Sequence, residues 1–106
     1  MTAKNIEECP GQIQTALDII GDKWTALIVR DLTTCDSKFS DLEASLGGIS
    51  PRTLSQRLDK LETEGVISKE LYCEHPPRYK YCLTPKGKEL QTILVDMAAW
   101  GARYAD

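Results

Sequence analysis

The side chains between residues 50 and 60 could carry recognition chemistry. If Leu54, Leu58 and Leu61 form the buried stripe of a helix, the polar side chains that point away from this stripe or flank it are Arg52, Thr53, Ser55, Gln56, Asp59 and Lys60. Arginine and glutamine can form two hydrogen bonds with a base edge, serine and threonine bond to bases less specifically, and lysine mostly meets phosphate. This face could therefore contact DNA, although an ordinary solvated helix surface has a similar composition.

Three further cations, Lys69, Arg78 and Lys80, follow in a segment rich in β-favouring residues. Pro76 and Pro77 interrupt this segment, and the pattern predicts a hairpin over residues 66–83. The cations could hold the tip of this hairpin against phosphates or a minor groove. A charged hairpin edge that prevents aggregation would explain them almost as well.

The net charge of −3 conceals an uneven distribution along the chain. Residues 1–49 carry 4 basic and 8 acidic residues, residues 50–88 carry 8 and 5, and residues 89–106 carry 1 and 3. The positive charge thus coincides with the two candidate contact segments. The acidic total, in contrast, argues weakly against a polyanionic partner.

The sequence offers no catalytic constellation. It has one histidine, no nucleophile motif and no glycine-rich phosphate loop, so we expect neither an enzyme nor a cofactor. The four cysteines, Cys9, Cys35, Cys73 and Cys82, contain no Cys-x-x-Cys pair. Such spacing argues against a metal site.

A disulfide within the hairpin is not expected either. If the hairpin turns at residues 75–76, Cys73 pairs near Arg78. Cys82 then pairs near Lys69, which leaves the two sulfurs about four positions, or on the order of 13 Å, apart.

The length of 106 residues predicts one domain, over residues 1–106, with a single hydrophobic core. The longest unbroken apolar runs have four residues, whereas a membrane-spanning helix requires roughly 20. Residues 1–10 contain no apolar stretch and do not resemble a secretory signal, so we expect a cytoplasmic protein without membrane contact.

Apolar periodicity, capping residues and glycines predict five helices. They cover approximately residues 13–20, 24–32, 39–46, 51–64 and 85–104. Gly21-Asp22 separates the first two helices, and Asp36-Ser37 is expected to cap the third. The last two helices begin at Ser50-Pro51 and Thr84-Pro85, where a hydroxyl precedes a proline at the first helical position. We interpret Trp24 as a core residue.

This order of elements predicts a mainly α-helical fold with a small antiparallel β-hairpin, the winged helix-turn-helix. The second helix of such a motif enters the major groove with its N-terminal residues on base edges. The recognition helix then covers about residues 51–64, the wing about 66–83 and the C-terminal helix about 85–104.

Several short motifs occur in a specific order and spacing. They are Cys9-Pro10, Ile20-Gly21-Asp22-Lys23-Trp24-Thr25, Leu27-Ile28-Val29-Arg30-Asp31-Leu32, Lys38-Phe39-Ser40-Asp41-Leu42, Gly48-Ile49-Ser50-Pro51-Arg52-Thr53-Leu54-Ser55-Gln56-Arg57-Leu58, Leu61-Glu62, Gly65-Val66-Ile67, Pro76-Pro77-Arg78-Tyr79-Lys80-Tyr81 and Leu83-Thr84-Pro85-Lys86-Gly87. Together they resemble the HxlR-type winged helix-turn-helix transcriptional regulators, which are related to the MarR-like proteins, over about Cys9 to Trp100.

The resemblance implies a homodimeric bacterial regulator that binds a palindromic operator in double-stranded DNA. By position it assigns to the recognition helix Ser50, Pro51, Arg52, Thr53, Gln56 and Arg57, and to the wing Arg78. The alternative is a winged-helix module that uses the same surface for a protein partner and does not bind DNA. The net charge of −3 motivates this alternative.

The resemblance also gives Cys9 a candidate role, because some regulators of this family sense oxidants or electrophiles through a cysteine just before the first helix. Glu7 and Glu8 would disfavour the thiolate of Cys9, whereas a helix N-terminus would favour it. A redox sensor and an inert cysteine both remain open. Cys35 is a candidate resolving partner.

The first and last helices, which flank a small core, carry apolar stripes that look larger than one chain can cover. The residues expected at a homodimer interface are Ile13, Leu17, Leu90, Ile93, Leu94, Met97, Trp100 and Tyr104. Packing of these stripes within their own domain is the alternative.

Overall fold

The computed structural model describes residues 10–105, and within them the predicted winged helix-turn-helix fold is confirmed. The elements in chain order are α1 (Pro10–Ile20), α2 (Lys23–Thr34), β1 (Ser37–Lys38), α3 (Phe39–Ser45), α4 (Pro51–Thr63), β2 (Ile67–Glu74), β3 (Pro77–Leu83) and α5 (Pro85–Tyr104). No helix within residues 10–105 combines the length and the apolar composition of a membrane-spanning segment.

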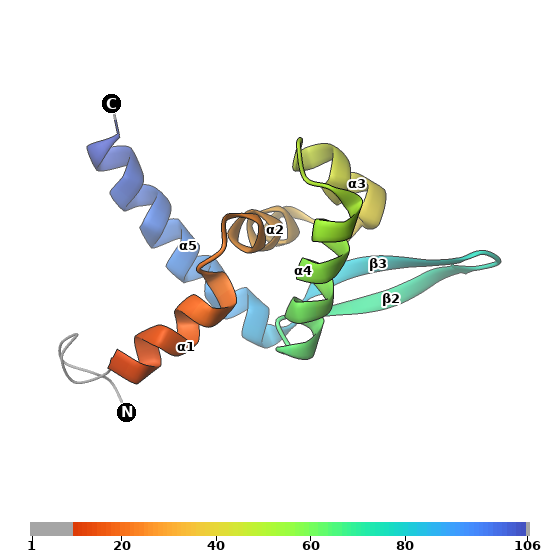
Figure 1. The fold of residues 1–106 in the computed structure, drawn as a ribbon, viewed down its shortest axis with the longest axis horizontal. Coiled ribbons are helices and arrows are strands. Elements are labelled where there is room, and N and C mark those ends of the chain that lie inside the picture. Colours follow the sequence, from red (N-terminus) through yellow and green to blue (C-terminus); the bar gives the residue numbers. More distant parts are fainter. Residues whose placement is uncertain (1–9, 106) are drawn as a thin grey trace.

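The molecule has two ends with α2 between them (Figure 1). On one side lie α3, α4 and the hairpin of β2 and β3, which projects away from the helices. On the other side α1 and α5 extend in the opposite direction, and the described chain measures 51 × 36 × 22 Å. The recognition helix and the wing expected from the sequence thus lie apart from the far ends of α1 and α5.

The core joins α2, α3, α4 and the base of the hairpin. Its buried apolar residues are Ile28, Val29, Leu32, Leu42, Leu46, Ile49, Leu54, Leu58, Leu61, Val66, Ile67 and Leu83. Trp24, predicted to be a core residue, packs half-buried against this cluster, with the Lys23 ammonium 4.7 Å from its ring centroid.

Helix α4 begins as its sequence predicts. The Ser50 hydroxyl accepts a hydrogen bond from the Thr53 N–H at 3.1 Å, and Pro51 takes the first helical position, where no N–H is needed. The helix ends at Thr63, and Gly65 follows with a φ of +75°, a conformation that glycine adopts without a steric penalty. The three leucines of the stripe are buried, so the polar face of α4 points outward.

The sheet contains a third strand that the sequence analysis missed. Ser37 of β1 pairs with Tyr81, and Lys38 pairs with Lys80, so the strand order is β1-β3-β2. The predicted cap of the third helix is consequently wrong, because Ser37 is buried in the strand and Lys38 is the residue that precedes α3. The Lys38 N–H donates to the Asp41 carboxylate at 3.0 Å. A strand of two residues has no periodicity that a sequence pattern could reveal.

The register of the hairpin is correct at its tip and shifts by one residue towards its base. Cys73 lies opposite Arg78 as predicted, but Cys82 lies opposite Ser68 and not Lys69. The shift occurs between Leu71 and Cys73, because an extra residue in β2 bulges out of the ladder.

The residue before α5, Thr84, is bonded to the two residues that follow α4 and precede the wing, Gly65 and Val66; we call this contact the joint. The Thr84 N–H donates to the Val66 carbonyl at 3.0 Å, and the Thr84 hydroxyl donates to the Gly65 carbonyl at 2.6 Å. The same hydroxyl accepts from the Gly87 N–H at 3.1 Å. Gly87 packs so closely that a β-carbon there would lie 2.1 Å from the Val66 carbonyl oxygen, so only glycine fits.

Candidate nucleic-acid interface

The first two turns of α4 present an exposed polar face. Arg52, Ser55 and Gln56 are exposed, and Arg52 forms no ion pair within residues 10–105. Ser50 and Pro51 are exposed at the start of the helix, whereas Thr53 is half-buried and its hydroxyl oxygen accepts from Ser50 at 2.9 Å. The helix thus offers two long side chains that can form paired hydrogen bonds with base edges.

Two cations of α4 turn the other way. The Nε of Arg57 lies 2.9 Å from a carboxylate oxygen of Asp22, at the start of α2, and both side chains are about two-thirds buried. The Nζ of Lys60 donates to the backbone carbonyl of Asp18, near the end of α1. Arg57 and Lys60 therefore contact the protein itself, and the structure does not bring them together with the exposed face of Arg52 and Gln56.

The three candidate cations of the wing differ in their surroundings. Arg78 is exposed near the turn, opposite Cys73, and has no ion pair among the described residues. Lys69 lies 3.9 Å from a Glu62 carboxylate oxygen and 4.7 Å from the ring centroid of Tyr79, so its charge is partly used. Lys80 is half-buried in the middle strand, where it pairs with Glu70 on one side.

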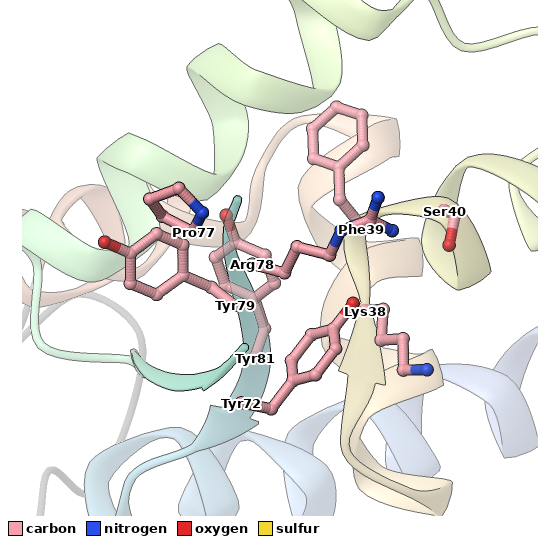
Figure 2. Close-up of a pocket in the computed structure, with 8 residues that line it drawn as sticks. All are labelled: Lys38, Phe39, Ser40, Tyr72, Pro77, Arg78, Tyr79 and Tyr81. Carbon is pink, nitrogen blue, oxygen red and sulfur yellow. The ribbon is translucent and has the colours of Figure 1, made fainter. Parts of the chain in front are cut away.

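A hollow of about 300 Å³ separates the wing from the start of α3 (Figure 2). Tyr72, Pro77, Arg78, Tyr79 and Tyr81 of the hairpin line one side, and Lys38, Phe39 and Ser40 line the other. The hollow opens between two cationic side chains, Arg78 and Lys38, the second of which has its Nζ 4.9 Å from the ring centroid of Tyr72. In helix-turn-helix proteins the first helix of the motif crosses the DNA backbone, and here that helix is α3.

The hydroxyl of Tyr81 stays protonated at neutral pH. Burial raises the pKa of this phenol, and the carboxylates of Asp59 and Glu62 raise it further.

Sequence reasoning missed the contribution of Lys38, Ser40 and the wing tyrosines. A cation just before the first helix of the motif was a usable signal for Lys38, because that helix lies next to the DNA backbone. The tyrosines gave no such signal, since alternating aromatic residues are equally typical of any half-buried strand.

The cysteines fall into two groups. Cys9, the candidate redox sensor, lies outside the described residues. Cys35 is exposed at the end of α2, while Cys73 and Cys82 are half-buried in the hairpin, with the Cys82 sulfur 3.2 Å from the Ser68 hydroxyl. Within residues 10–105 no group of three or more potential ligands is arranged to hold a metal ion.

The terminal helices expose large apolar side chains. The exposed fractions are 66% for Trp100, 63% for Tyr104, 57% for Val95, 53% for Met97, 52% for Leu17 and 42% for Ile93. We call Leu17 of α1 and the four residues Ile93, Met97, Trp100 and Tyr104, which share one face of α5, the apolar patch. Val95 lies on the opposite side of α5 and was not among the expected interface residues. Three further residues were expected at the interface. Of these, Ile13 is half-buried, and Leu90 and Leu94 pack against the core of their own chain.

Comparison with known proteins identifies relatives along nearly the whole chain. The HxlR-like helix-turn-helix family matches residues 19–106. YvaP of Bacillus subtilis (strain 168), described as an uncharacterized HTH-type transcriptional regulator, is 42% identical over 100 residues, which cover 94% of this chain and 92% of YvaP.

Solved structures agree with the sequence matches. The redox regulator HypR in its oxidized form has a TM-score of 0.82 and 31% identity, with 92% of this chain and 99% of HypR covered. The reduced form of the transcriptional regulator YodB from B. subtilis has a TM-score of 0.79 and 25% identity, with 100% and 97% covered. The chain folds as a winged helix-turn-helix with an exposed polar α4, and it matches these sequences and structures. It belongs to the HxlR-like helix-turn-helix family of transcriptional regulators.

Proposed function

We propose that this protein binds a specific operator in double-stranded DNA as a homodimer and thereby regulates transcription. The observation that carries the proposal is the exposed N-terminal face of α4, on which Arg52, Ser55 and Gln56 are not engaged by other charged groups of residues 10–105. Side chains of these types read base edges in the major groove.

The contacts divide into base readout and backbone positioning. Arg52 and Gln56 contact base edges, while Ser50, Pro51, Thr53 and Ser55 line the path of the adjacent backbone. Arg78 reaches the minor groove or its phosphates from the wing, and Lys38 meets the backbone beside α3. Lys60, Lys69 and Lys80 add positive charge at the periphery.

The apolar patch supports the homodimer. An isologous interface repeats the same patch on both copies, so the two-fold axis would pass near α1 and α5. Two recognition helices would then meet half-sites of a palindrome about one helical turn, or roughly 34–36 Å, apart.

A salt titration of binding tests the proposal. The DNA is the upstream region of the protein's own gene, and a random duplex of equal length is measured in parallel. We expect affinity to fall steeply with salt, and Arg52→Ala to weaken operator binding by about 1–3 kcal/mol while random DNA changes little. Arg30→Ala is the matched control, because Arg30 is another exposed arginine, pairs with Asp31 on α2 and lies away from α4 and the wing.

Two results would overturn parts of this proposal. Equal losses for Arg52→Ala on operator and random DNA would remove Arg52 from base readout. No affinity for any fragment selected from a pool of genomic DNA would favour the alternative, a winged-helix module for a protein partner.

We also propose that Cys9 acts as a thiol switch. The similarity to HypR, a redox regulator with a solved oxidized form, supports this role, and exposed Cys35 is the candidate resolving partner. Cys9→Ser should leave binding of the reduced protein intact and abolish its change on mild oxidation. A Cys9→Ser variant that still responds to diamide would assign the response to another cysteine.

A further inference from the structure

We infer that Asp22 and Arg57 are positioning residues: their ion pair fixes the recognition helix against the elbow between α1 and α2, and discrimination of the operator depends on it. The inference rests on the proposed DNA-binding function. It concerns two residues that contact each other within the chain and not the DNA.

The elbow consists of Gly21 and Asp22, which alone separate α1 from α2. The Gly21 N–H donates to the Leu17 carbonyl at 2.8 Å, and a β-carbon on Gly21 would lie 2.5 Å from that same oxygen. Asp22 follows at once as the N-cap of α2, where one carboxylate oxygen accepts from the Thr25 N–H at 3.0 Å. The position of the Asp22 carboxylate is therefore set by the backbone of the elbow.

The other carboxylate oxygen of Asp22 binds α4. It lies 2.9 Å from the Nε of Arg57, with exposed fractions of 33% for the Asp22 side chain and 30% for the Arg57 side chain. One carboxylate thus caps α2 and holds α4 at the same time. Partial burial makes this pair less sensitive to screening by salt than a surface ion pair.

The charge of Asp22 persists at neutral pH. Burial alone would raise the pKa of its carboxyl, but the hydrogen bond from the Thr25 N–H and the charge of Arg57 outweigh burial and hold the pKa below 3.8. The pair is therefore ionised under the conditions in which DNA would be bound.

Lys60 provides a second tie between the same elements. Its Nζ donates to the Asp18 carbonyl, one of the last four carbonyls of α1, which have no partner within their helix. Arg57 and Lys60 lie three residues apart and so share one side of α4. Both cations consequently contact residues at or just before the elbow, Asp22 and Asp18.

The leucine stripe cannot supply this positioning alone. The hydrophobic effect is non-directional, so burial of the stripe selects the side of α4 that faces the core but supplies no directional bond to a particular atom. Paired hydrogen bonds from Arg52 or Gln56 to a base edge require donor and acceptor to be aligned within tenths of an ångström. A directional ion pair one residue beyond Gln56 restricts the rotation that these contacts cannot tolerate.

Two substitutions remove the pair from opposite sides. Asp22→Asn retains the cap, because asparagine caps helices as well as aspartate does, and it replaces the charged oxygen that Arg57 binds with an amide NH2, which cannot accept a hydrogen bond. Arg57→Gln removes the guanidinium. We expect each variant to reduce the ratio of operator to random-DNA affinity about tenfold, and the double variant to reduce it no further, because both remove the same interaction.

The control is Asp18→Asn. Asp18 lies four residues before Asp22, its exposed side chain accepts from Gln14 at 2.7 Å, and it undergoes the same change of charge. We expect this control to retain the wild-type ratio. Arg57→Lys should recover most of the discrimination, since the ammonium can still pair with Asp22; this variant decides the question if Asp22→Asn is too unstable to assay.

The outcomes separate the competing roles of Arg57. If Arg57 contacted phosphate, Arg57→Gln would reduce the salt slope by about one, and Asp22→Asn would raise affinity for all DNA by releasing the guanidinium. Either that pattern or wild-type discrimination in both variants would overturn the inference. A wild-type protein that binds no DNA would overturn the proposed function itself.

Discussion

The two ends of this molecule differ in how they use their apolar side chains. In α2, α3, α4 and the base of the hairpin, the apolar stripes converge on one core, and Ile28, Val29, Leu42, Leu54 and Leu61 have no exposed surface. In α1 and α5 the apolar patch remains open, with Trp100 exposed over two-thirds of its surface. Both ends have helices with clear apolar periodicity.

An apolar stripe therefore does not by itself reveal which residues will bury it. The stripe of α4 is covered by its own chain, whereas only the first half of α5, with Leu90 and Leu94, packs on the core. Beyond that point α5 projects away from the other helices (Figure 1). An end that folds on itself can hold a rigid recognition surface, and an end that remains open suits a second copy.

The largest effects are expected when an apolar side chain is truncated at each end of the molecule. Leu58→Ala should lower the free energy of unfolding by about 2–5 kcal/mol at every protein concentration, because it opens a cavity in the core. Trp100→Ala should instead reduce the concentration dependence of thermal unfolding, because it weakens the proposed homodimer. Equal, concentration-independent losses in both variants would show that the two ends are alike.

The joint between the ends should tolerate no side chain. Gly87→Ala places a β-carbon against the Val66 carbonyl oxygen and should lower the free energy of unfolding by about 1–3 kcal/mol. Gly101→Ala, on the same helix and with no atom within 4 Å of the new carbon, should raise it by about 0.5–1 kcal/mol. Denaturant titrations of both variants measure the contrast, and an unchanged midpoint for Gly87→Ala would contradict it.

The buried end also contains a polar defect. The Thr25 hydroxyl oxygen is buried and has no hydrogen-bond partner within residues 10–105. Thr25→Val removes this hydroxyl at nearly constant volume and should raise the free energy of unfolding by about 1 kcal/mol. Thr25→Ser, which keeps the hydroxyl and loses a methyl group, should lower it, so a gain from serine would contradict this account.

The smallest expected effect is a change in how the stability of the fold depends on pH. Because the pKa of Asp22 is lower in the folded chain than its usual 3.8, this carboxylate contributes stability that is present above that pH and is lost as pH falls through the lowered value. Asp22→Asn should therefore flatten the decline in stability below about pH 4. The measurement is thermal unfolding between pH 3 and pH 7, and parallel curves for both proteins would exclude the contribution.

The parts of the fold with repeated spacing or strong local chemistry could be predicted from sequence. The starts of α4 and α5 are both hydroxyl-proline pairs, and each hydroxyl accepts a backbone N–H in the structure. The leucine stripe of α4 correctly indicated its buried side. In these places the signal lies within one or two turns of helix, so no distant residue can change it.

Features that depend on distant partners could not be predicted. The strand β1 exists because β3 pairs with it, and the bulge that shifts the hairpin register follows from how the two strands meet. The resemblance placed Arg57 among the recognition-helix residues expected to bind DNA, and nothing near it in the sequence indicated its partner Asp22, which lies 35 residues away in the chain. Leu90 and Leu94 belong to the same stripe as the exposed residues of α5, and only packing separates them.

The joint at Thr84 has a mechanical consequence. The wing and α5 both start beside residues 64–66. The Thr84 hydroxyl donates to the carbonyls of Gly65 and Val66, and the Lys86 ammonium donates to the carbonyl of Glu64. Helix α5 extends about 30 Å from this joint, since it has 20 residues at 1.5 Å each. A change in the angle at which α5 leaves the joint would also change the direction of the wing, because the start of α5 is hydrogen-bonded to residues 64–66, from which the wing departs.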